Sequence, residues 1–126
     1  MGKFDGVLLC SDLDQTLTNN KGIITSNVID SIHYFQQNGG TFTIATGRLP
    51  AYLSKYVGLL SIKAPIICHN GATIYSYETK SFLRKSYLNP QVSELLNFVY
   101  KNYDCVQFFH FHSLEVTHTF SASQKE

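Results

Sequence analysis

Charged residues are scarce in this sequence. They make up 15% of its 126 residues, and the formal net charge at pH 7 is +1. Proteins that hold nucleic acids or anionic membranes by electrostatic attraction carry a basic patch or a large positive charge, so we expect neither partner. Hydrophobic residues make up 44% of the chain, which is typical of a folded domain and excludes the composition of a disordered protein.

Cysteines and long apolar runs are scarce as well. Cys10, Cys68 and Cys105 lie far apart and form no Cys-x-x-Cys pair, so the sequence indicates neither a disulfide framework nor a zinc site. No apolar segment approaches the ~20 residues that cross a bilayer, and residues 1–6 lack the hydrophobic region of a signal peptide. We therefore expect a protein of the reducing cytoplasm.

The sequence does contain three short apolar runs, each followed by a polar loop. Residues 7–10 precede Asp12 and Asp14, residues 42–45 precede Thr46, Gly47 and Arg48, and residues 65–68 precede Asn70 and Gly71. Each run is short enough to be a buried strand. The three loops contain most of the polar residues that could carry chemistry.

The segments between these runs have helical spacing. Apolar residues recur every three or four positions in 28–35 and in 53–60, and we expect the first helix to be capped by Thr25 or Ser26 and to end at Gly39. Alternating strands and helices imply parallel strands joined by right-handed crossovers. Because ligands bind at the carboxyl ends of such strands, the three polar loops predict one site.

After residue 70 the pattern changes. Residues 73–77 and 81–87 predict a hairpin, residues 90–99 predict a third helix that Pro90 opens, and residues 105–111 predict another strand. Between the first strand and the first helix, the turn residues in 17–24 predict a short hairpin flap.

These motifs resemble the haloacid dehalogenase superfamily of phosphohydrolases, in its Cof-type (IIB) branch with a large cap. In that family Asp-x-Asp-x-Thr follows the first strand, Thr or Ser the second, and Asn-Gly-Ala often the third. The motifs stand here in the same order, within residues 4–105, at Asp12, Asp14, Thr16, Thr46 and 70–72. Gln15 replaces the usual glycine, and the chain ends before the family's later lysine and acidic motifs.

The resemblance implies an α/β fold. A Rossmann-like parallel sheet would form the N-terminal half of the family's core over residues 1–81, and the start of an α+β cap would follow over 82–112. We expect residues 113–126 to be a frayed tail. Because the first strand is central in the family's sheet, its outer edge would be unpaired in this chain, which favours self-association through that edge.

The resemblance also implies a reaction. Asp12 would attack the phosphorus of a phosphate monoester and form an aspartyl phosphate, while Asp14 would protonate the leaving oxygen and then deprotonate the attacking water. Mg²⁺ would be held by the carboxylate of Asp12 and the main-chain carbonyl of Asp14, because a cation offsets the repulsion between these acids and a phosphate. Thr46 would hydrogen-bond a phosphate oxygen.

The other loop residues would bind the substrate and its phosphate. They are Thr16, Gly47, Arg48, Asn70 and Gly71. Taken alone, each motif has a plainer interpretation, since Asp-x-Asp is often a turn or a helix cap and Asn-Gly is a turn signal. It is their combination at three strand ends that favours catalysis.

The sequence therefore predicts a Mg²⁺-dependent phosphohydrolase of a small phosphorylated metabolite, such as a sugar phosphate or a phosphorylated cofactor. We expect weak or absent turnover, because the chain has neither the later lysine nor the later acids, and one oxyanion donor alone is worth ~10² to 10³ in rate. The alternative is an inactive fragment that binds phosphate or a partner protein. A truncated product, a deliberate fragment and half of an assembly completed in trans all remain open.

Overall fold

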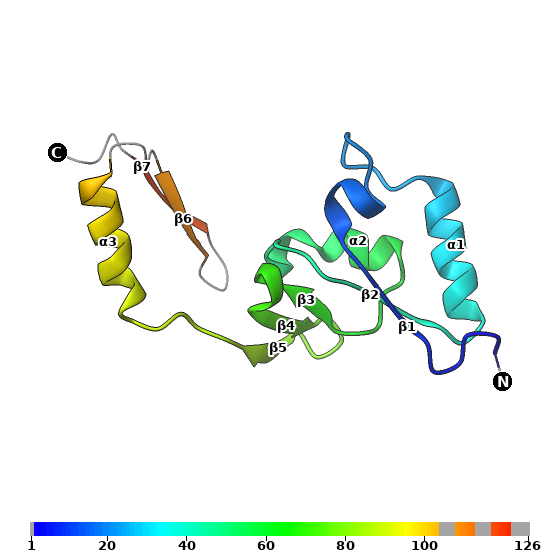
Figure 1. Ribbon diagram of the computed structural model, residues 1–126. Coiled ribbons are helices and arrows are strands. Elements are labelled where there is room, and N and C mark those ends of the chain that lie inside the picture. Colours follow the sequence, from blue (N-terminus) through cyan, green and yellow to red (C-terminus); the bar gives the residue numbers. More distant parts are fainter. Residues whose placement is uncertain (1, 104–107, 113–116, 122–126) are drawn as a thin grey trace. The chain divides into compact units, whose positions relative to one another are not determined.

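The computed structural model of the chain describes residues 2–103, 108–112 and 117–121 (Figure 1). The chain divides into two compact units, Met1–Lys85 and Ser86–Glu126. None of the helices in the part that the structure describes is long and apolar enough to cross a membrane.

The first unit begins with two parallel strands. β1 (Leu8–Ser11) pairs with β2 (Thr41–Ile44) in a register that sets Leu8 beside Thr41 and Ser11 beside Ile44. The chain between them forms α1 (Ser26–Gln37), which lies beside the two strands in Figure 1. The predicted β-α-β order with parallel strands is therefore confirmed here.

The third strand joins this pair only at one point. β3 (Ile66–Cys68) follows α2 (Ser54–Leu59) and a helical turn at Pro50–Tyr52. A single parallel bridge connects Ala45, just after β2, with Ile67. The continuous parallel sheet that the sequence predicted is thus only partly formed, because β3 has three residues and pairs mainly with the strand after it.

That next strand belongs to a hairpin. β4 (Thr73–Ser76) is antiparallel to β3 and to β5 (Ser81–Lys85). Tyr75 packs edge-on against Tyr77 and Phe82, with 5.0 Å between ring centroids in both pairs. The predicted hairpin is confirmed, although both strands end earlier than expected.

α1 is held by its apolar face. Ile32 is buried, and Val28 and Phe35 pack against the core. The predicted side-chain cap is wrong: Thr25 precedes the first turn, but its hydroxyl makes no capping hydrogen bond. At the other end Gly39 adopts a φ of +91°, a conformation that glycine accepts without strain, so the helix ends where the sequence predicted.

The core of the first unit is built around β2, β3 and the helices. Its fully buried side chains are Leu13, Ile44, Leu53, Leu60, Ile66 and Cys68. β1 contributes no fully buried side chain.

The predicted flap is a tight turn. The side-chain oxygen of Asn19 accepts hydrogen bonds from the backbone N–H groups of Lys21 and Ile23, and the Asn19 N–H donates to the Ile23 carbonyl. No strand is assigned on either side of it, within the fully described residues 17–24. The Asn19 side chain provides hydrogen-bond acceptors for the backbone N–H groups of the turn, so the turn does not need a pair of flanking strands.

The second unit contains α3 (Val92–Asn102), β6 (Phe108–His112) and β7 (Thr117–Ser121), and β6 and β7 are antiparallel. The side chain of Asn89 accepts a hydrogen bond from the Gln91 N–H before α3 begins. β7 differs from the expected tail over 113–126, since five of those residues form a strand. The remainder of that tail, and residues 105–107 of the predicted strand, lie outside the described residues.

Candidate active site

The chain leaves β1 through one wide helical turn. Leu13 is fully buried, and its carbonyl accepts hydrogen bonds from the backbone N–H and the hydroxyl of Thr18, at 2.9 and 3.2 Å. Within the turn Asp14 and Gln15 leave the helical conformation, and Gln15 has a φ of 60°. Because Leu13 anchors the turn, the aspartates on either side of it, Asp12 and Asp14, are exposed at fixed positions.

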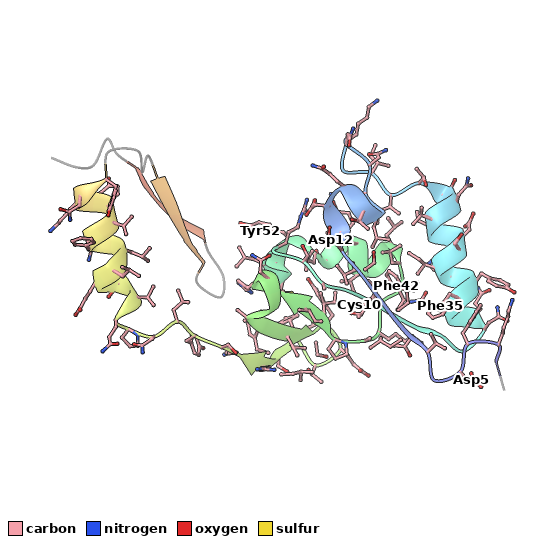
Figure 2. All side chains as sticks on the ribbon, viewed as in Figure 1. Asp5, Cys10, Asp12, Phe35, Phe42 and Tyr52 are labelled. Atoms are coloured by element: carbon pink, nitrogen blue, oxygen red, sulfur yellow. The ribbon has the colours of Figure 1, made fainter. Side chains whose placement is uncertain are left out.

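Asp12 lies at the end of β1, where the ribbon enters this turn (Figure 2). It opens onto a pocket of about 340 Å³. The pocket is lined by residues from all three strand-end loops: Asp12, Ala45, Thr46, Gly47, Ile67, Asn70 and Gly71. The structure therefore brings most of the predicted site residues together around one cavity.

Thr16 is not among the residues that line the pocket. Its hydroxyl donates a hydrogen bond of 3.2 Å to Oδ2 of Asp12, while the hydroxyl of Ser11 donates to the Asp12 carbonyl at 2.9 Å. These contacts fix the Asp12 side chain and backbone. The Thr16 hydroxyl thus contacts Asp12, whereas the resemblance implied a contact with the substrate.

The second and third loops are tied to each other. The Thr46 N–H donates to the Ile67 carbonyl at 2.9 Å, and the Asn70 N–H donates to the Thr46 carbonyl at 3.2 Å. A Cβ at Gly47 would lie 2.8 Å from Oδ1 of Asn70, so any larger residue would push the Asn70 side chain from its position beside the loop. The buried hydroxyl of Thr46 accepts a hydrogen bond from the Arg48 N–H.

Asp14 and Arg48 pair with each other, outside the residues that line the pocket. Arg48 donates through Nε to Oδ2 of Asp14 at 2.9 Å and through a terminal nitrogen to Oδ1 at 2.6 Å. The side chain of Asp14 is 48% exposed, and that of Arg48 is 35% exposed. The hydrogen bond to Asp14 raises the pKa of Arg48 above its ordinary value. This forked pair links the loop after β1 to the loop after β2.

Two tyrosines that the sequence did not single out support these loops. Tyr56 is buried, and its ring lies 5.6 Å from the Arg48 guanidinium. The hydroxyl of Tyr77 donates a hydrogen bond to the carbonyl of Pro50, just beyond the second loop. No sequence pattern indicated the contact between Tyr56 and Arg48, because it depends on how the helix packs beside the loop.

The oxygen donors of this site suit a Mg²⁺ ion that the protein binds together with water and a substrate phosphate. They do not suit a metal ion held by protein side chains alone. No group of three or more His, Cys, Asp or Glu residues could hold a metal among the residues whose placement is described. The carboxylate of Asp14 is engaged by Arg48, which leaves that of Asp12 facing the pocket. Mg²⁺ needs only one or two carboxylates when waters and substrate phosphates complete its octahedron, so this donor set suits it.

Comparisons with known proteins identify the family. The family model described as haloacid dehalogenase-like hydrolase matches residues 9–126. The chain is 27% identical to a putative phosphatase of Mycoplasma pneumoniae, over 81% of this chain and 42% of that protein. It is 29% identical to the pyridoxal phosphate phosphatase of Escherichia coli, over 60% of this chain and 28% of that protein.

Solved structures agree in fold. A phosphatase of this superfamily from Bacteroides thetaiotaomicron superposes with a TM-score of 0.75 at 22% identity, over 90% of this chain and 41% of that one. A subclass IIB sugar phosphatase gives a TM-score of 0.73 at 23% identity, over 90% and 43%. The chain thus spans less than half the length of these relatives. With most of its length matched by the family model, it belongs to the haloacid dehalogenase-like hydrolases.

Proposed function

We propose that the chain carries the phosphate-binding and nucleophile half of a Mg²⁺-dependent phosphohydrolase that acts on a small phosphorylated metabolite. The observation that carries this proposal is the position of Asp12 in one pocket with Thr46 and Asn70, residues from three separate strand-end loops. The names of the relatives, a putative phosphatase and a pyridoxal phosphate phosphatase, support it.

In the proposed reaction an Asp12 oxygen attacks the phosphorus and the bond to the leaving oxygen breaks, which gives an aspartyl phosphate. Asp14, which takes up a proton from solvent once Arg48 has left it, donates that proton to the leaving oxygen, so the alcohol leaves neutral. A water then attacks the phosphorus and gives its proton to Asp14, and the Asp12 carboxylate and inorganic phosphate are released. The hydroxyl of Thr16 holds Asp12 in place through its hydrogen bond to Oδ2.

Arg48 has a positioning role in this scheme. In the free protein its guanidinium is committed to both oxygens of Asp14, and Asp14 can exchange a proton with substrate only after this pair opens. A substrate phosphate would compete for the same fork, since guanidinium groups bind phosphate and carboxylate in the same geometry. Phosphate entry would therefore release Asp14 for acid–base chemistry.

The phosphate itself would be bound by the pocket's second and third loops, through the Thr46 hydroxyl, the Gly47 backbone and the Asn70 and Gly71 loop. Mg²⁺, held by the Asp12 carboxylate and the Asp14 carbonyl, would supply charge neutralisation for the phosphate. A pocket of about 340 Å³ suits a compact ligand, and we infer a sugar phosphate or a phosphorylated cofactor as substrate. A cytoplasmic location fits the free thiols of Cys10 and Cys68.

The test is hydrolysis of an aryl phosphate with and without Mg²⁺. We expect weak turnover by this chain, because it covers less than half of its relatives. Any turnover should disappear in Asp12→Asn and persist in Asp30→Asn, a matched change at an exposed position of α1. Turnover that survives Asp12→Asn would refute the assigned nucleophile.

A chain without turnover is tested by binding. In a titration with inorganic phosphate and Mg²⁺, amide NMR signals of Thr46, Gly47 and Asn70 should shift, and Thr46→Val should weaken the response. Pocket amides that do not respond in the wild-type chain would contradict the proposed phosphate site.

A second candidate is a non-catalytic binding module. The observation that favours it is the strand β1, which pairs along one edge only among the strands that the structure describes. An open edge of this kind binds other chains by adding a strand. Binding of phosphate without turnover would be compatible with this role.

A further inference from the structure

Tyr56 is a buried aromatic residue that contacts two segments next to the candidate active site. It lies on α2, is 3% exposed and belongs to the hydrophobic core of the first unit. Its hydroxyl donates a hydrogen bond of 3.5 Å to the Gly22 carbonyl, in the tight turn of residues 19–23, and its ring lies 5.6 Å from the Arg48 guanidinium. Because it is packed in the core and bonded at its tip, the ring has little freedom to move.

Arg48 has two partners of different kinds. Its N–H groups donate to both carboxylate oxygens of Asp14, and its central carbon lies within the ~6 Å over which an aromatic ring attracts a cation. The pKa of Arg48 is raised chiefly by the hydrogen bond to Asp14, and Tyr56 adds to that increase. The arginine is thus held by a carboxylate and by a ring at the same time.

These two contacts use different parts of the guanidinium. An anion binds at the edge of the planar group, through its N–H donors, whereas an aromatic ring contacts its face. A phosphate that replaced Asp14 at the edge would therefore leave the contact with Tyr56 in place. The carboxylate is an exchangeable partner, since the Asp14 side chain is 48% exposed, and the buried ring is a permanent one.

We propose that Tyr56 is a positioning residue, which holds the Arg48 guanidinium beside the strand-end loops both when it pairs with Asp14 and when it binds a substrate phosphate. This inference rests on the proposed phosphatase function. An arginine side chain that is already ordered loses less conformational entropy when it binds an anion. Tyr56 thereby raises the affinity of the site for phosphate without touching the phosphate.

Lys55 offers a comparison on the same ring. Its ammonium group lies 4.5 Å from the Tyr56 ring centroid, closer than the guanidinium of Arg48, but Lys55 is exposed. An exposed ammonium is strongly hydrated, and cation–π contacts at exposed sites are the weaker ones. Removal of the Lys55 charge should therefore leave the position of Arg48 unchanged.

Nuclear Overhauser contacts between the Arg48 side chain and the Tyr56 ring test the position directly, in a chain whose core is intact. We expect these contacts in the free wild-type protein, in the wild-type protein with saturating inorganic phosphate and Mg²⁺, and in Asp14→Ala, which lacks the carboxylate partner. Their loss in phosphate or in Asp14→Ala would overturn the proposal, because Arg48 would then be held by its anion alone.

Phosphate affinity tests the consequence. In a titration with inorganic phosphate and Mg²⁺, followed by the amide signals of Thr46 and Asn70, Tyr56→Leu should bind about two- to tenfold more weakly than the wild-type chain. Tyr56→Phe, which keeps the ring, and Lys55→Gln should bind within about twofold of the wild-type chain. Phe42→Leu removes another buried ring, from β2, and should also leave the affinity unchanged, which controls for a general loosening of the core.

The outcomes separate this inference from the phosphatase proposal. Equal affinity in Tyr56→Leu and the wild-type chain, or an equal loss in Phe42→Leu, would overturn the inference alone. An equal loss in Tyr56→Phe would also overturn it, because the hydroxyl and not the ring would then be responsible. Wild-type amides that do not respond to phosphate would refute the proposed phosphate site, and the contacts in the free protein and in Asp14→Ala would still decide whether the ring holds Arg48.

Discussion

β1 and β2 are neighbours in one parallel pair and have four residues each, yet their surroundings are opposite. On β2, Phe42 and Ile44 are 2% and 0% exposed, whereas on β1 Leu8 is 63% exposed. The residues compared, Leu8, Phe42 and Ile44, are all apolar. The difference shows that burial depends on what covers a strand's faces and edges: β2 has β1 on one side and the bridge to β3 on the other.

The largest expected effect comes from truncating one residue on each strand. Ile44→Ala should lower the free energy of unfolding by about 2–5 kcal/mol, because it removes a fully buried side chain and leaves a cavity. Leu8→Ala should change it by less than about 0.5 kcal/mol, because the Leu8 side chain is mostly exposed. Urea unfolding of both variants measures the contrast. Equal losses would mean that the Leu8 side chain is buried in solution.

The buried cysteine of β3 extends the comparison to pH. Burial raises the pKa of the Cys68 thiol on β3 to about 11, from an ordinary value of 9.0. Between these values the unfolded chain loses its proton first, so it binds fewer protons than the folded chain and stability falls as pH rises. The loss approaches about 3 kcal/mol above pH 11, since one pKa unit corresponds to about 1.4 kcal/mol. Denaturant unfolding from pH 8 to about 11 measures this loss.

Cys68→Ala is the control for this slope. It should lower stability at pH 8 but flatten the decline above about pH 9. A residual decline should begin only above about pH 10, because burial raises the pKa of Tyr77 to about 12. An unchanged slope in Cys68→Ala would assign the pH dependence to another group.

A smaller effect distinguishes the loops after β1 and β3. Gln15 has a φ of 60° and Asn70 a φ of 53°, but asparagine tolerates this left-handed conformation better than glutamine. Gln15→Gly should therefore raise stability by up to about 1 kcal/mol, and Asn70→Gly should raise it less. Thermal unfolding of the two variants measures the difference. Destabilisation by Gln15→Gly would indicate that the glutamine side chain has a contact of its own.

The smallest effect concerns the link between the loops after β1 and β2. A double-mutant cycle with Asp14→Asn and Arg48→Gln should give a coupling of about 0.5–1 kcal/mol, because the forked pair is half-exposed and screened by water. The coupling should fall in high salt. A coupling of zero at low salt would show that the pair does not form in solution.

The sequence predicted the parts of this fold that follow from local rules. Apolar spacing located α1 and the hairpin of β4 and β5, and the rule that ligands bind at strand ends led to a pocket that Asp12, Thr46 and Asn70 share. The proximity of these three residues was predictable because the carboxyl ends of parallel strands meet at one edge of a sheet. Their roles in catalysis stay predictions.

Other features depend on packing that no local rule describes. The pairing of Arg48 with Asp14 joins residues 34 positions apart and depends on side-chain conformation. The cap expected at Thr25 failed because the backbone closed the first turn without its hydroxyl. β7 was missed because its residues lack the apolar alternation of a half-buried strand, and its pairing with β6 comes from backbone hydrogen bonds that any sequence can supply.

The central claim is that the Asp12 carboxylate accepts a phosphoryl group in the strand-end pocket. Fluoroberyllate, which mimics a phosphoryl group on a carboxylate, tests it without requiring turnover. In ¹⁹F NMR with Mg²⁺ we predict signals of the bound species for the wild-type chain and for Asp30→Asn, and none for Asp12→Asn. Signals that persist unchanged in Asp12→Asn, or a wild-type chain that shows none, would contradict the claim.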